Sequence, residues 1–118
     1  MPIINSVIAG GGSGTEKVAL SVVFWCPEES SMNYSRLYSI TANGTTYTLS
    51  DSFTQMNNPS ASPSSKGSLY YGTLEFDKGT NVSWSVDYSP KAQIQNDSGT
   101  ILMDESKTLI IYVVYSVG

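Results

Sequence analysis

The chain has 118 residues, a formal net charge of −4, 14% charged residues, no His and a single Cys. This length predicts one domain. The absence of His removes the usual general base and the Ser–His–Asp and Cys–His nucleophiles, and the lone Cys26 cannot close an internal disulfide. Six Lys and Arg residues provide no basic surface for nucleic acid or anionic lipid. We therefore expect a protein that is not an enzyme, needs no cofactor or metal, and binds neither nucleic acid nor membrane.

Residues 1–14 differ in composition from the rest of the chain. An apolar, β-prone segment precedes the run GGGSG at 10–14, whose glycines allow many backbone conformations. No basic region precedes the apolar residues, so no secretory signal peptide is predicted. We expect an N-terminal arm and glycine-rich tether over 1–14, separate from a domain over 15–118. The alternative is a first edge strand folded back onto the domain. The side chains expected to bind a partner are Ile3, Ile4, Val7 and Ile8.

Two strands at opposite ends of the domain are apolar on both faces. The segment from Lys17 to Trp25 has period two, with apolar side chains in both phases. The segment from Lys107 to Val117 repeats this pattern, with Ile111 on one face and Ile110 on the other. Such strands are either central and covered on both sides, or they lie against another subunit.

The middle of the chain contains further short strands separated by turn residues. Asn43–Gly44 predicts a two-residue hairpin turn, and residues 50–68, with two prolines, predict a long irregular loop. No segment has helical period. Strands are expected at 37–41, 45–49, 69–76, 82–88, 92–94 and 100–103. Seven to eight short antiparallel strands predict an all-β sandwich, with a closed barrel as the alternative.

Several large apolar side chains are candidates for surface contacts. Trp84 alternates in phase with Val82 and is therefore predicted in the core. Exposed aromatic rings can stack on sugars or pack on a protein partner. The candidate contact residues are Phe53 and Met56 in the long loop, with Tyr70 and Tyr112 in strands.

Acidic side chains are the remaining candidates for chemistry. Pairs such as Asp104–Glu105 fall at predicted turns, where solvated charges are expected. Acids from several turns could gather around Ca²⁺ at one end of the sandwich, but no EF-hand spacing is present. No metal or catalytic residue is therefore assigned.

The stretch from Phe76 to Val114 reads FDKGTNVSWSVDYSPKAQIQNDSGTILMDESKTLIIYVV. It resembles the C-terminal half of immunoglobulin-like modules found in bacteriophage virion proteins and bacterial surface proteins. There a Lys-Gly-Thr turn, a strand alternating Val and Trp, a Ser-Gly-Thr-Ile segment, a Met-Asp turn and a Lys-Thr-Leu strand follow in this order. The hairpin at 40–47 is also similar to one common in such modules. The likeness covers roughly half the chain and carries over no catalytic residue.

The resemblance implies an immunoglobulin-like β-sandwich with an extended N-terminal arm. It also implies a virion component of the capsid decoration or head-fibre type, made in the host cytoplasm and assembled onto the particle there. The partner would be a capsid or other virion protein, or a second copy of this chain in a homo-oligomer. The alternative is a carbohydrate-binding or host-adhesion module that binds a cell-surface glycan through loop aromatics.

Overall fold

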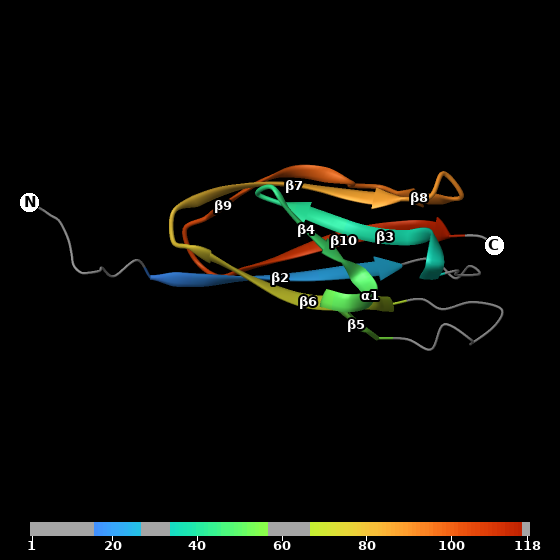
Figure 1. Ribbon diagram of the computed structural model, residues 1–118, viewed down its shortest axis with the longest axis horizontal. Helices are drawn as coiled ribbons and strands as arrows, with labels where there is room; N and C mark the ends of the chain where they lie inside the picture. Colours follow the sequence, from blue (N-terminus) through green and yellow to red (C-terminus); the bar gives the residue numbers. More distant parts are fainter. Residues whose placement is uncertain (1–15, 27–33, 57–66, 117–118) are drawn as a thin grey trace, which may run out of the picture.

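A computed structural model describes residues 16–26, 34–56 and 67–116, which form two packed β-sheets (Figure 1). One sheet has the strand order β5-β6-β2-β10-β8 and the other the order β4-β3-β7-β9. These two separate sheets confirm the all-β sandwich and exclude a closed barrel for the described strands. The strands in the described residues are β2 (Lys17–Cys26), β3 (Leu37–Ala42), β4 (Thr45–Thr48), β5 (Thr54–Gln55), β6 (Gly67–Asp77), β7 (Thr80–Tyr88), β8 (Ala92–Ile94), β9 (Ser98–Met103) and β10 (Lys107–Ser116).

Strand β2 lies in the middle of the five-stranded sheet. It pairs antiparallel with β6 from Lys17 to Cys26 and parallel with β10 from Leu20 to Trp25. The expectation of antiparallel strands throughout is therefore wrong at β2–β10. Between β2 and β10 the chain crosses from one sheet to the other several times. The last crossing, from β9 to β10, brings β10 beside β2 in the same direction (Figure 1).

The β3–β4 hairpin confirms the turn expected at Asn43–Gly44. Both residues have positive φ, 54° and 87°, as a type I′ turn requires. Asn tolerates this conformation and Gly adopts it without steric cost, so the sequence selects this turn locally.

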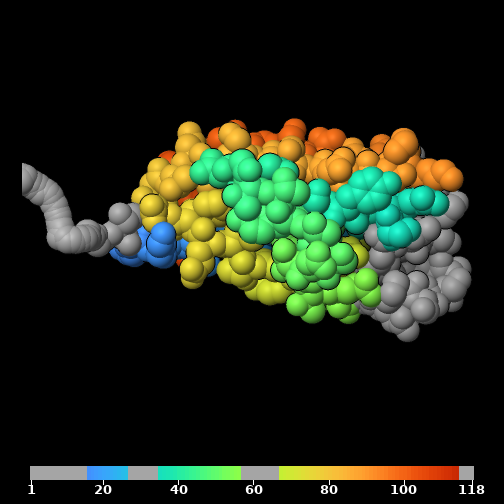
Figure 2. Space-filling model, in the orientation of Figure 1, coloured from blue at the N-terminus to red at the C-terminus, as the bar shows by residue number. Residues whose placement is uncertain are grey.

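The segment expected to be an irregular loop begins with regular structure. It contains the helix α1 (Leu49–Ser52) and then β5, which pairs with Tyr70 and Tyr71 of β6. Figure 2 shows α1 and β5 in green at the surface of the sandwich. A 3₁₀ turn, η1 (Tyr34–Arg36), also precedes β3. The expectation of no helical segment is therefore wrong at these two places, while residues 57–66 lie outside the described part. No helix in the described ranges has the length and apolar character needed to cross a bilayer.

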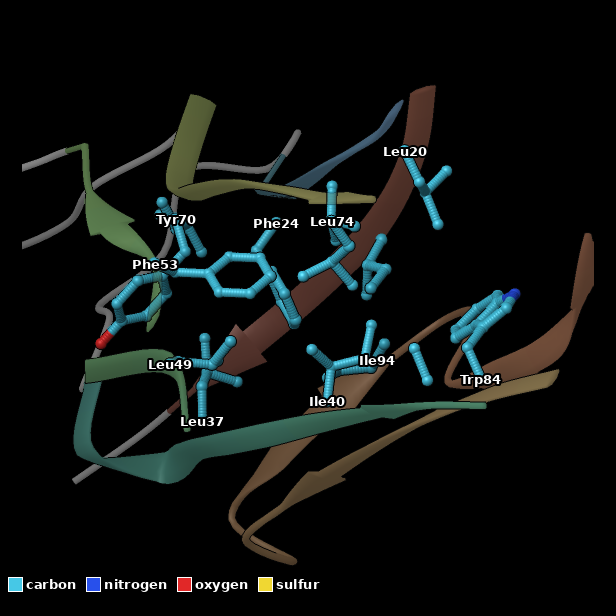
Figure 3. Close-up of a cluster of buried hydrophobic side chains, with 14 of the residues drawn as sticks. Leu20, Phe24, Leu37, Ile40, Leu49, Phe53, Tyr70, Leu74, Trp84 and Ile94 are labelled. Atoms are coloured by element: carbon cyan, nitrogen blue, oxygen red, sulfur yellow. The ribbon is translucent and has the colours of Figure 1, made fainter. Parts of the chain in front are cut away.

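The core at the α1 end is built around the Phe24 ring. Its centroid lies 6.0 Å from that of Phe53 and 6.2 Å from that of Tyr70, and both contacts are edge-to-face (Figure 3). Phe53 and Tyr70 are 7% and 4% exposed. The expectation that they form surface contacts is therefore wrong, whereas Trp84 is buried in the core as predicted.

Gly72 on β6 provides the space that the Phe53 ring occupies. A Cβ atom at this position would lie 2.9 Å from two atoms of the ring, closer than real contacts allow. The absence of a side chain at Gly72 thus lets Phe53 turn inward after α1, which in turn positions β5 against β6.

We predict that Gly72→Ala lowers the free energy of unfolding by about 1–3 kcal/mol, because the new methyl group must displace the Phe53 ring. Phe53→Ala alone should cost about 3–5 kcal/mol through lost core packing. In the Phe53→Ala background the cost of Gly72→Ala should nearly vanish, since the clash is gone. Denaturant unfolding of the four proteins measures this coupling, and additive costs would contradict the contact.

Candidate interaction surface

The outer faces of the two sheets differ in chemistry. The four-stranded sheet presents hydroxyl side chains across its strands, including Thr41, Ser83, Ser85 and Thr100, with Tyr38 and Leu102 as isolated large apolar residues. The five-stranded sheet instead presents four large side chains that are 37–41% exposed. We define the apolar outer face by these four and the half-buried residue between them: Trp25, Tyr71, Ile110, Tyr112 and Val23.

Strand register brings these five residues together. Val23 of β2 lies opposite Tyr71 of β6 on one side and Ile110 of β10 on the other. Two positions further along, Trp25 lies opposite Tyr112. Because paired positions point to the same side of a sheet, the five side chains form one surface. Trp25, Ile110 and Tyr112 line a shallow, open hollow of about 210 Å³.

Asn96 hydrogen-bonds the main chain of β10 on the side of the strand where β8 pairs. Its Nδ2 donates to the Ile110 carbonyl, and its Oδ1 accepts from the Tyr112 N–H, both at 2.8 Å. The side chain thereby extends the main-chain pairing of the short strand β8, which ends at Ile94. Because Asn96 bonds on both sides of residue 111, it fixes the backbone that carries two of the exposed side chains.

Tyr71 is oriented by neighbours on the same face. The hydroxyls of Ser21 and Thr73 hydrogen-bond its phenol oxygen and lower the pKa of Tyr71 below its ordinary value of 10.0. Thr73 is the next outward residue on β6, and Ser21 lies opposite it on β2. The ring is therefore directed along the sheet rather than out into solvent.

Charged side chains lie at the other end of the sheet. Lys17 pairs with Asp77 at 2.5 Å and Lys107 with Asp104 at 2.9 Å, and the hydrogen bond from Lys107 lowers the pKa of Asp104. Lys17 is six residues before Val23 on β2, a distance of about 20 Å along the strand. In the described ranges no group of three or more potential metal ligands comes together.

The structure places the candidate contact residues in different environments. Tyr112 belongs to the apolar outer face, and Met56 is 51% exposed at the edge beside β5. Phe53 and Tyr70 are in the core. The arm residues lie outside the described part of the chain: Ile3, Ile4, Val7 and Ile8.

Sequence reasoning did not select Trp25, Tyr71 or Ile110 as contact residues. The signal was present in the two-sided apolar pattern of the first and last strands, which left open a subunit contact. The sequence does not show the parallel β2–β10 register, and this register places the exposed residues of the two strands side by side on one surface.

No protein-family model, curated protein or solved structure matches the chain. Function is therefore inferred from the chemistry of the surface. The apolar outer face carries no charged side chain, and its groups can bury apolar area but cannot transfer protons near neutral pH. This chemistry favours non-covalent binding.

We predict that Asn96→Ala weakens the end of β10 without changing the fold. Loss of two hydrogen bonds should lower the free energy of unfolding by about 1–3 kcal/mol. The exchange protection of the Tyr112 amide should fall most, since this N–H loses its acceptor. Hydrogen exchange followed by NMR measures the protection of this amide. The matched control is Asn81→Ala, which replaces an exposed Asn on β7. Equal protection in both variants would contradict the role of Asn96.

Proposed function

We propose that this protein is a non-enzymatic component of a bacteriophage virion, of the capsid decoration or head-fibre type. It binds its neighbours through the N-terminal arm and the apolar outer face. The observation that carries the proposal is the contrast between the two sheets: one outer face is hydroxyl-rich, and the other has clustered aromatic and aliphatic side chains. Contiguous apolar patches on soluble proteins commonly mark interaction sites.

The free energy of burying the apolar outer face explains why the N-terminal arm is needed as a second contact element. The exposed parts of the four large side chains amount to roughly 300–400 Å². Burying this area gives about 8–10 kcal/mol before association costs of about 4–15 kcal/mol. The face alone therefore supports a weak complex. Four apolar arm residues, at about 1.5–3 kcal/mol each when fully buried, and repetition over a symmetric particle make the attachment stable.

The immunoglobulin-like assignment is part of this proposal. The two-sheet sandwich and the sequence motifs in residues 76–114 support it. In the immunoglobulin topology, however, the last two strands are neighbours in one sheet, whereas β9 and β10 lie in different sheets here. We therefore propose a likeness of sandwich architecture rather than of strand order.

A carbohydrate-binding or host-adhesion module is the second candidate. Trp25 and Tyr112 are exposed aromatics beside a hollow, which is the kind of platform on which a sugar ring stacks. The version based on loop aromatics loses Phe53, which is buried. Saturable binding on a glycan array, reduced by Trp25→Ala, would favour this candidate over a protein partner.

We predict that a protein lacking residues 1–14 folds but does not join the particle. The described sheets begin at Lys17, so circular dichroism and the thermal transition should be preserved. A second variant keeps the chain length and replaces the four apolar arm residues by Ser. Mass spectrometry of purified virions from the phage encoding the chain measures incorporation.

The full chain should be present in these virions and both variants absent. Equal incorporation of either variant would overturn the role of the arm. Absence of the full chain from the particles would overturn the virion assignment itself.

A further inference from the structure

We infer that the apolar outer face binds the same face of a second copy of this chain, forming a two-fold dimer in which the five-stranded sheets pack back to back. This inference rests on the proposed function as an interaction protein and names the partner of one of its two contact elements. A two-fold contact uses one patch twice, so that each residue of the patch meets the patch of the other copy.

The position of the face in the sheet determines the kind of partner. Val23 and Trp25 lie on β2, which is hydrogen-bonded on one side to β6 and on the other to β10. A partner therefore cannot extend the sheet at this strand and must pack on its side chains. A broad, hydrogen-bonded sheet face is matched by another sheet face, and such faces stack about 10 Å apart.

The neutral face is suited to an uncharged partner surface, and the same face of a second copy is such a surface. The chain carries a net charge of −4, so two copies repel each other at long range, and a neutral contact adds no further repulsion. The apolar outer face is bordered by uncharged Ser21, Thr73 and Gln93, and its burial leaves no ion unpaired. Lys17, at the far end of β2, already has a carboxylate partner in its own chain.

The chemistry of the hollow favours protein over sugar. Ile110 lies two positions from Tyr112 on β10, beside the pair formed by Trp25 and Tyr112, and none of the three lining side chains is charged. Sugar sites need several convergent polar groups, whereas Tyr and Trp with aliphatic neighbours are typical of protein interfaces. The open hollow of about 210 Å³ gives an apolar side chain of the other copy a concave surface to pack against.

The size of the face sets the expected strength of the dimer. Its large side chains expose roughly 300–400 Å², below the 800 Å² or so that each partner buries in a standard stable interface. We therefore expect a dimer that forms at micromolar concentration and dissociates on dilution, rather than an obligate one.

The test compares Ile110→Glu with Leu102→Glu by sedimentation velocity of the full chain from low to high micromolar concentration. Ile110 and Leu102 are 39% and 46% exposed on strands of opposite sheets, so the two substitutions are matched. Ile110→Glu places a carboxylate in each copy at the contact and should weaken dimerisation at least tenfold. Leu102→Glu should dimerise as the wild type does.

Further outcomes decide the inference. Ile110→Thr, which keeps a β-branched residue in the strand, replaces Ile110→Glu if the latter fails to fold by circular dichroism. A wild type that is monomeric throughout, or equal weakening by Leu102→Glu, would overturn the inference. So would a dimer that is lost without residues 1–14 and kept in the Ile110 variant.

The proposed function fails separately from the inference. A chain that dimerises through Ile110 but is absent from virions supports the dimer and overturns the virion assignment. A chain that is monomeric but present in virions supports the virion assignment and overturns the dimer.

Discussion

The parallel pairing of β2 with β10 is the interaction on which the rest of the structure depends. Its register joins Phe24 to Ile111 on the inner side and Trp25 to Tyr112 on the outer side. Phe24 and Ile111 are fully buried and belong to the core. One set of main-chain hydrogen bonds therefore builds both the core and the surface that we propose as an interface.

The apolar outer face follows from the period of a β-strand. A shift of one residue would bury Trp25 and expose Phe24, so the register that forms the core must direct the alternate apolar residues outward. Polar residues at those positions would serve an isolated domain equally well, as the hydroxyl side chains of the opposite sheet do. The apolar residues are instead suited to burial against a partner, and Asn96 holds the strand that presents two of them.

Local features were readable from the sequence, and non-local ones were not. Alternation predicted the long strands, and Asn43–Gly44 predicted the hairpin, because each depends on adjacent residues. The inward turn of Phe53 depends on the missing side chain of Gly72, far along the chain. Tyr70 is buried because it lies in phase with Leu74 on the inner side of β6, opposite Phe24 of β2, a pairing between segments far apart in the sequence. The outer face was visible as a two-sided pattern, but its extent required the β2–β10 pairing.

The most direct test of the central claim is whether Trp25 is exposed in one chain and covered in the assembly. The chain has two tryptophans, of which Trp84 is buried at 7% exposure. Replacing Trp84 by Phe therefore leaves Trp25 as the one source of tryptophan fluorescence. Acrylamide quenching across protein concentration then reports access to the apolar outer face. We expect strong quenching in dilute solution and protection as concentration rises. Quenching that is equal at every concentration would contradict the claim that this face is an interface between copies.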